Sequence, residues 1–172
     1  SWRACRTTNS RRRGRLCFDK LRTNGAGLLI VDLPDLAAME ALGARIARRL
    51  RPGDVVALSG PLGSGKTTLA RAVIAALGYT GEVPSPTFTL VEAYDLDPPL
   101  VHADFYRLER PREADELGLD DYREGAALLA EWPEKAGGFG HEPGCLAIAL
   151  EIAGSGRKAI VEPGDDWLGR WP

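Results

Sequence analysis

A glycine-rich segment of eight residues constrains the fold of this chain more than any other feature. It reads Gly60-Pro61-Leu62-Gly63-Ser64-Gly65-Lys66-Thr67 and matches the P-loop pattern G-x-x-x-x-G-K-[ST]. An apolar run, Val55 to Leu58, precedes it, and a helical pattern from Thr67 to Leu77 follows it. Glycines let backbone amides surround phosphate oxygens without Cβ clashes, and the helix directs its positive end at the same anion. The segment therefore predicts a strand–loop–helix unit that binds the phosphates of a nucleotide.

Two polar residues at the end of this pattern carry its chemistry. Lys66 is expected to reach the β- and γ-phosphates, and the Thr67 hydroxyl is expected to bind Mg²⁺. The alternative interpretation is a glycine-rich turn that binds no ligand, in which case the match to the P-loop pattern is accidental. The guanine-specific motif N-K-x-D does not occur in the chain, so adenine is the expected base.

Further apolar runs alternate with helical patterns along the chain. Apolar residues recur at three- and four-residue spacing from Leu36 to Leu50 and indicate an amphipathic helix, and short helices are predicted between residues 111 and 122. The predicted strands cover residues 28–31, 55–58, 88–91, 100–106 and 126–130. Two more, 146–152 and 159–161, flank a Gly-Ser-Gly turn, which is typical of a hairpin. The pattern predicts an α/β fold, a P-loop NTPase three-layer sandwich whose mainly parallel sheet has an antiparallel edge hairpin.

The charge of the chain is unevenly distributed. Residues 1–27 hold eight basic and one acidic side chain, a net charge of +7, whereas residues 28–172 hold 14 basic and 23 acidic ones, a net charge of −9. We expect residues 1–27 to be a basic, disordered extension, residues 28–162 to form a P-loop ATPase domain, and residues 163–172 to be a short C-terminal tail. A basic arm for nucleic acid or an organelle transit peptide is the alternative for the first segment.

Cysteine usage and hydropathy favour a cytoplasmic location. The three cysteines, Cys5, Cys17 and Cys145, have neither the count of a disulfide framework nor the spacing of a zinc site. No apolar run approaches the roughly 20 residues that cross a bilayer, so no membrane association is expected.

A P-loop enzyme needs a carboxylate at the end of a neighbouring strand to hold or orient Mg²⁺. Asp104 and Glu131 each follow a predicted strand, where open α/β sheets bind ligands. The pattern alone leaves open which of them serves, or whether either is an exposed strand-end charge. Their neighbours His102 and Trp132 fit core packing as well as a role in the site. Residues 85–89 are interpreted as a γ-phosphate-sensing loop or as a proline-stiffened turn.

Taken together, these motifs resemble those of the TsaE (YjeE) family, small bacterial ATPases that are needed to make threonylcarbamoyladenosine in tRNA. The resemblance covers about residues 28–162. It rests on Gly60-Pro61-Leu62-Gly63-Ser64-Gly65-Lys66-Thr67-Thr68, Ser85-Pro86-Thr87-Phe88-Thr89-Leu90-Val91, His102-Ala103-Asp104-Phe105-Tyr106-Arg107, Glu116-Leu117-Gly118 and Glu131-Trp132-Pro133-Glu134. Many families share the first block, whereas the later blocks in this order are specific.

The resemblance implies roles for individual residues. It implies that Thr67 and Glu131 bind Mg²⁺, and that Asp104 is the acid needed for hydrolysis, with Lys66 as the other catalytic residue. The nucleotide-binding residues that it implies are Gly60, Gly63, Ser64, Gly65, Lys66, Thr67, Thr68 and Arg157. The helix entry around Pro34 corresponds to a segment at the edge of the nucleotide.

The resemblance also implies a function, with ATP and Mg²⁺ as cofactors and a TsaB/TsaD-type complex as the partner. In that family ATP binding favours assembly with the complex, hydrolysis resets it, and tRNA is involved only indirectly. Hydrolysis by the isolated chain is expected to be slow, because no obvious arginine finger is present in cis. Two alternatives remain, namely a P-loop kinase of a small-molecule acceptor and a non-catalytic nucleotide-binding adaptor.

Overall fold

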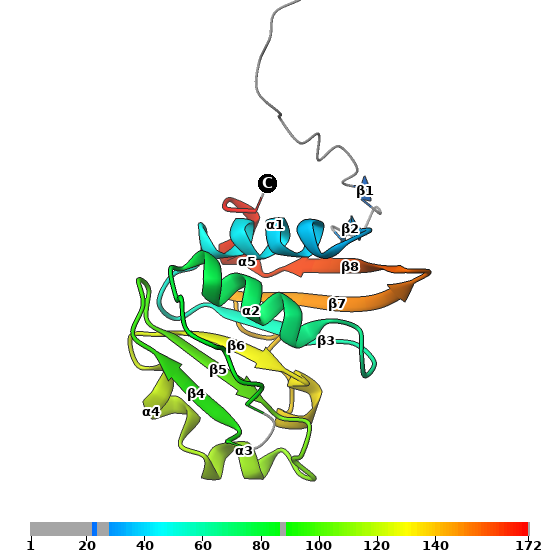
Figure 1. Ribbon diagram of the computed structural model, residues 1–172. Coiled ribbons are helices and arrows are strands. Elements are labelled where there is room, and N and C mark those ends of the chain that lie inside the picture. The colour runs from blue at the N-terminus through cyan, green and yellow to red at the C-terminus, as the bar shows by residue number, and fades with distance from the viewer. Residues whose placement is uncertain (1–21, 24–27, 87–88, 172) are drawn as a thin grey trace, which may run out of the picture.

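A computed structural model describes residues 22–23, 28–86 and 89–171 of the chain (Figure 1). Its elements are β1 (Arg22–Thr23), β2 (Leu29–Leu33), α1 (Leu36–Ala47), β3 (Val55–Ser59), α2 (Lys66–Ala76), β4 (Val91–Tyr94), β5 (Leu100–Asp104), α3 (Arg112–Glu116), α4 (Leu119–Arg123), β6 (Ala127–Glu131), the 3₁₀ helix η1 (Pro133–Ala136), β7 (Cys145–Ala153), β8 (Gly156–Pro163) and α5 (Asp165–Leu168). Most of the expected extension, residues 1–21 and 24–27, lies outside the described residues, as do residues 87–88 of the segment interpreted as a γ-phosphate-sensing loop.

The described strands form one eight-stranded sheet in the order β1-β2-β8-β7-β3-β6-β5-β4 (Figure 1). At its centre β3 pairs in parallel with both β7 and β6, and β6 pairs in parallel with β5. The predicted hairpin forms as β7 and β8, and β2 extends that antiparallel edge. Strand β4 pairs antiparallel with β5 at the opposite edge. The predicted α/β fold is confirmed, and the structure adds that antiparallel strands lie at both edges of the parallel centre.

Helices cover both faces of the sheet. Alternate residues of β3 point to opposite faces, so that Val56 and Leu58 belong to one hydrophobic cluster and Val55 and Ala57 to another. The first cluster contains buried residues of α1 and α2, and the second contains those of α3 and α4. Burial on both faces explains why β3 is a continuous apolar run. The structure therefore has the predicted three layers.

Helix α1 packs beside α2, which follows the P-loop, on the same face of the sheet. Asp35 caps α1, because its Oδ1 accepts a hydrogen bond of 2.8 Å from the backbone amide of Ala38. The two helices approach closely at Gly43, where an added Cβ would lie only 2.6 Å from the Cβ of Ala72. This packing fixes the helix whose first turn faces the P-loop.

The length of the helices bears on membrane insertion. The longest described helix, α1, has 12 residues and is about 18 Å long. None of the described helices combines the length and apolar character needed to cross a bilayer.

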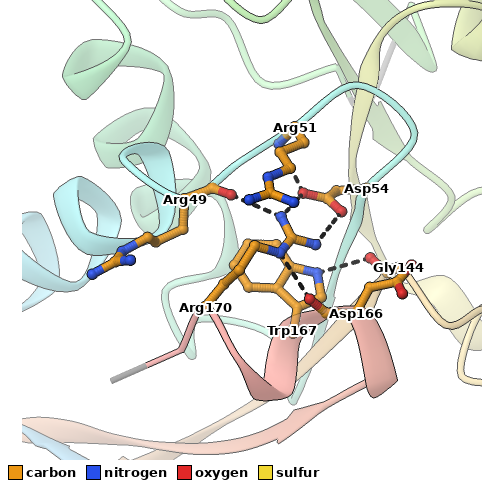
Figure 2. Close-up of polar contacts among 7 residues, drawn as sticks. All are labelled: Arg49, Arg51, Asp54, Gly144, Asp166, Trp167 and Arg170. Carbon is orange, nitrogen blue, oxygen red and sulfur yellow. Dashed lines mark hydrogen bonds and ion pairs between the residues drawn. The ribbon is translucent and has the colours of Figure 1, made fainter.

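Residues 163–172, expected as a short tail, contribute instead to the core as far as they are described. Helix α5 carries Trp167, which is fully buried and donates from Nε1 to the carbonyl oxygen of Gly144 at 2.8 Å (Figure 2). Arg170 forms two hydrogen bonds of 2.7 Å with the carboxylate of Asp54, and its guanidinium lies 4.4 Å from the centre of the Trp167 ring. We call Asp54, Trp167 and Arg170 the C-terminal clasp. The sequence predicts a tail here because a helix of four residues, such as α5, is too short to show a hydrophobic periodicity.

Candidate nucleotide-binding site

The P-loop joins the carboxyl end of β3 to the first turn of α2. Gly60 and Gly65 have φ angles of 131° and 101°, which residues with a Cβ rarely adopt. A Cβ at Gly60 would also lie 2.2 Å from the carbonyl oxygen of Leu150 in β7. No side chain caps α2, since its N-cap is Gly65. The first backbone amides of the helix therefore face the loop with no side-chain acceptor, as an anion site requires.

The lysine of the motif lies inside this loop. Lys66 is 4% exposed, and its Nζ donates to the carbonyl oxygens of Gly60 at 2.8 Å and Pro61 at 3.1 Å. The same ammonium lies 3.8 Å from the centre of the Trp132 ring. Burial lowers the pKa of Lys66, while the nearby carboxylates, Glu131 first among them, act in the opposite direction. The loop thus contains a buried cation, for which a phosphate group is a suitable counter-charge.

Asp104 and Glu131 end adjacent parallel strands. They are direct partners in the register of β5 and β6, and both are buried, at 4% and 1% exposure. The hydroxyl of Thr67 donates to Glu131 Oε2 at 2.8 Å, although the two residues are 64 positions apart in the chain. Oδ1 of Asp104 accepts a hydrogen bond of 3.0 Å from the amide of Tyr106. Both carboxylates that were candidates from the sequence therefore lie at the site, and Glu131 contacts the P-loop threonine directly.

His102 takes part in the same group of contacts. It is fully buried, and its Nε2 lies 2.9 Å from Glu131 Oε1. Its burial agrees with the interpretation of His102 as a core residue, and it contacts Glu131 without being among the described residues that line the cleft.

These side chains surround a cleft of about 250 Å³. Its lining includes most of the residues predicted from the sequence, namely Gly63, Gly65, Lys66, Thr67, Thr68, Asp104, Glu131 and Trp132. Three further residues line the cleft, namely Leu62, Ser85 and Tyr106. The sequence predicts no individual role for them. Tyr106 packs against Trp132 with 5.1 Å between ring centres. Nothing in its spacing marks Tyr106, but it stands two residues after Asp104, where the chain leaves β5.

Arg157, predicted as a nucleotide-binding residue, lies behind the P-loop. Its Nε donates to the carbonyl oxygen of Ser64 at 3.1 Å and one terminal nitrogen donates to that of Gly63 at 2.9 Å. It is not among the described residues that line the cleft. In this structure Arg157 contacts the backbone of the loop. Ser64 itself is buried, and its Oγ has no hydrogen-bond partner among the described residues.

A second groove adjoins the cleft at Thr68. It has a volume of about 570 Å³ and runs between α1 and α2, with Leu36 and Glu40 on one side and Arg71 and Ala72 on the other. The helix entry around Pro34, which the family resemblance places at the edge of the nucleotide, leads into α1, whose Leu36 and Glu40 line this groove.

The oxygen donors at the cleft suit Mg²⁺ better than a softer metal. Among the described residues, no group of three or more His, Cys, Asp or Glu side chains is placed to hold a metal ion. A hydroxyl and one or two carboxylates fit Mg²⁺ that is also held by phosphate oxygens, which is its usual mode of binding. The residues present therefore fit a magnesium–nucleotide complex better than a free metal.

Cys145 does not supply a reactive thiol to this site. It lies at the start of β7, at the end of the sheet opposite to the P-loop, and it is buried. Burial raises the pKa of the Cys145 thiol to about 11, so the thiolate is scarce at neutral pH.

Comparison with known proteins identifies the family. The family model described as "Threonylcarbamoyl adenosine biosynthesis protein TsaE" matches residues 33–159. A relative from Streptomyces coelicolor, named "tRNA threonylcarbamoyladenosine biosynthesis protein TsaE", is 45% identical over 100 residues, which are 56% of this chain and 68% of the relative. A relative of the same name from Haemophilus influenzae is 39% identical over 114 residues, which are 62% and 72% of the two chains.

A solved structure agrees with this match. The crystal structure of Bacillus subtilis YdiB superposes with a TM-score of 0.69 and 30% sequence identity, and the match covers 83% of this chain and 90% of that one. The matched family residues, 33–159, contain the P-loop, both carboxylates and Arg157. The chain therefore belongs to the TsaE family, whose name places it in threonylcarbamoyl adenosine biosynthesis.

Proposed function

We propose that this protein is a Mg²⁺-dependent ATPase that supports the threonylcarbamoyladenosine modification of tRNA. It binds a TsaB/TsaD-type complex and resets that complex through ATP hydrolysis, in the cytoplasm. The observation that carries the proposal is the hydrogen bond of 2.8 Å between Thr67 and Glu131, with Asp104 beside Glu131 on the adjacent strand. The P-loop alone is compatible with binding only, whereas two buried carboxylates at its mouth are what a hydrolytic site needs.

Each residue of the site has a distinct part in this proposal. Lys66 exchanges its backbone acceptors for phosphate oxygens, and the amides of the P-loop and of the first turn of α2 bind the same phosphates. Thr67 and Glu131 hold the metal ion, which neutralises the charge that develops on the phosphates when it is bound. Asp104 orients the attacking water and accepts its proton. The groove at Thr68 accommodates the base.

The isolated chain is expected to hydrolyse ATP slowly. Among the described residues that line the cleft, Lys66 is the one cationic side chain, and no arginine is present. P-loop enzymes commonly receive an arginine from a partner, which raises turnover by about 10³- to 10⁵-fold. Partner-dependent hydrolysis fits this arrangement, and it supports a switch in preference to a free-standing kinase.

The partner complex, and not this chain, is proposed to bind tRNA. Residues 28–172 carry a net charge of −9. Binding to nucleic acid is dominated by phosphate contacts with basic side chains, which an acidic surface opposes.

The proposal is tested by measuring ATP hydrolysis with Mg²⁺, with EDTA and with the TsaB/TsaD-type complex. We expect slow, Mg²⁺-dependent release of phosphate that rises when the complex is added. Acceptor-dependent release of ADP would indicate a kinase instead. An Asp104→Ala variant that leaves turnover of the complete assembly unchanged would indicate a non-catalytic adaptor.

The Lys66→Ala substitution tests the phosphate site directly. The substitution removes the buried cation, and we expect ATP affinity to fall by about 10- to 100-fold, as for the loss of a hydrogen bond to a charged group. The matched control is Lys135→Ala, since Lys135 is an exposed lysine in η1 and should leave affinity unchanged. Isothermal titration with ATP measures both. Equal affinities for Lys66→Ala and the wild type would contradict the assignment of the P-loop.

A further inference from the structure

The two carboxylate oxygens of Glu131 have different partners. Oε2 accepts the hydroxyl of Thr67 at 2.8 Å, and Oε1 lies 2.9 Å from Nε2 of His102. His102 is fully buried and Glu131 is 1% exposed. Thr67, Glu131 and His102 lie on three different elements, α2, β6 and β5. A carboxylate with a fixed contact on each oxygen has little freedom to rotate.

The hydrogen-bond pattern also indicates which ring nitrogen of His102 carries the proton. Nδ1 has no hydrogen-bond partner among the described residues. A proton on Nδ1 alone would leave a buried N–H unpaired and would aim the lone pair of Nε2 at a carboxylate oxygen, and both arrangements are unfavourable. A proton on Nε2 gives a donor to Glu131 and leaves only an unpaired acceptor, which buried sites tolerate more readily.

The register of the sheet explains why His102 can reach Glu131. His102 and Asp104 are two positions apart on β5, so their side chains lie on the same face. Asp104 is the direct partner of Glu131, and His102 is therefore its diagonal neighbour. The sheet thus places an N–H donor behind the Glu131 carboxylate. This donor is on the side away from the cleft, since His102 is not among the described residues that line the cleft.

We propose that His102 is a positioning residue that orients the Glu131 carboxylate for the metal ion of a bound nucleotide. This inference rests on the proposed function of the site. His102 donates from Nε2 to Oε1 and thereby keeps Oε2 directed at Thr67 and the cleft. Residues that orient a metal ligand in this way typically change metal affinity by about 10- to 100-fold when they are lost.

Two amide substitutions separate this role from packing. The side-chain nitrogen of glutamine reaches the position of Nε2, whereas the shorter side chain of asparagine reaches only that of Nδ1. His102→Gln should therefore retain an N–H donor to Glu131. His102→Asn should lose this donor, although asparagine carries the same amide group as glutamine. His102→Leu fills a similar volume without any donor. A residue needed only for packing would tolerate leucine at least as well as either amide.

The measurement is the affinity for ADP in EDTA and in a titration with Mg²⁺, made on each folded variant. We expect all variants to bind ADP in EDTA as the wild type does, because the phosphate cradle is intact. The Mg²⁺ concentration at half-saturation should rise by about 10-fold or more in His102→Leu and His102→Asn, and stay within about 2-fold in His102→Gln. Equal Mg²⁺ dependence in the leucine variant and the wild type would overturn the positioning role alone. A wild type whose ADP affinity ignores Mg²⁺ would overturn the proposed function, and this inference with it.

The tautomer gives a second test that needs no substitution at His102. The chain has two histidines, His102 and His141, so the His141→Gln variant assigns the ¹⁵N-labelled ring of His102 in NMR spectra. We expect a proton on Nε2. A neutral ring protonated on Nδ1 alone would overturn the proposal, even where the leucine and asparagine variants do not fold.

Discussion

Arg157 shows how a side chain outside the cleft can set the shape of the P-loop. Its guanidinium donates to the carbonyl oxygens of Gly63 and Ser64, and a third hydrogen bond of 2.8 Å joins it to the carbonyl oxygen of Gly156. A peptide group whose carbonyl points toward Arg157 directs its amide to the other side. Arg157 therefore ties β8 to the P-loop, and the peptide between Ser64 and Gly65 directs its amide away from the guanidinium.

Substitution of Arg157 distinguishes two roles for its side chain. In one it supports the P-loop through hydrogen bonds, and in the other its positive charge attracts a phosphate. We expect Arg157→Ala to weaken ATP binding by about 10-fold, because the loss of a few hydrogen bonds loosens the loop. Arg157→Lys should be nearly as weak, since an ammonium cannot reproduce the planar fork of donors. Titration calorimetry with ATP provides the measurement, and Lys158→Ala on the same strand provides the control. Recovery of full affinity by lysine would show that the charge matters and the fork does not.

The functional side chains were predictable to different degrees. Lys66 and Thr67 follow from a local pattern, because the P-loop motif itself fixes their place at the end of the glycine-rich loop. Asp104 and Glu131 follow from their place at strand ends, although the sequence alone does not show that these two strands are neighbours. The contact of His102 with Glu131 spans 29 positions, and those of Arg157 with the P-loop span 93 and 94, so no local pattern encodes them.

Among the helices and strands, the C-terminal clasp joins distant segments through a largely buried ion pair. Arg170 and Asp54 have side chains that are 10% and 6% exposed, and they form two hydrogen bonds of 2.7 Å (Figure 2). The hydrogen bonds to Asp54 raise the pKa of Arg170, so the pair stays charged on the arginine side. The clasp lies at the start of β3, and the P-loop lies at the end of the same strand. It therefore holds the end of the sheet opposite to the site.

Removal of Arg170 should destabilise the fold without changing the site. We expect Arg170→Ala to lower the free energy of unfolding by about 3 kcal/mol, because the buried Asp54 carboxylate loses its charged partner and keeps, among the described residues, only the backbone amide of Arg51. Urea denaturation gives this value, and the double variant with Asp54→Ala should lose less than the sum of the two single variants. Arg48→Ala is the control, since Arg48 is exposed on the same side of the sheet, and it should change stability by less than about 0.5 kcal/mol. ATP affinity of the folded Arg170→Ala protein should equal that of the wild type, and a large loss of affinity would contradict the separation of clasp and site.

The elements differ in how well the sequence predicts them. Helices α1 and α2 are long and strongly patterned, and β3 is a continuous apolar run, so the positions of all three agree with prediction within a few residues. Strand β4 is short and lies at an edge, so neither its register nor its antiparallel direction is visible in a pattern of four residues. Helix α5 has four residues, and its place in the core comes from one tryptophan that packs against distant segments. The cause in both cases is the tertiary environment, which overrides local preference.

For the chain as a whole, the division of charge separates the site from the basic segment. The residues that line the cleft and the groove, and those of the clasp, all lie between positions 36 and 170. This part of the chain lies within residues 28–172, which carry −9, whereas residues 1–27 carry +7. Of the basic segment, Arg22 and Thr23 are described, and they pair with β2 at the far edge of the sheet from β4. Among the described residues, the P-loop and the first turn of α2 contact β6 and β8, and Gly60 approaches β7.

Deletion of residues 1–27 should therefore leave ATP hydrolysis within about 2-fold of the wild type, both alone and with the TsaB/TsaD-type complex. Any retention of tRNA by the isolated full chain on a filter at low salt is expected to be non-specific attraction to the +7 segment, so the deletion should reduce it to background. The full chain measured at about 50 and 150 mM salt is the control, because binding through basic side chains weakens steeply over this range. A large loss of hydrolysis on deletion would make the segment part of the catalytic unit. Retained tRNA binding would place an RNA surface on the acidic domain and contradict the proposal that tRNA is reached only through the partner complex.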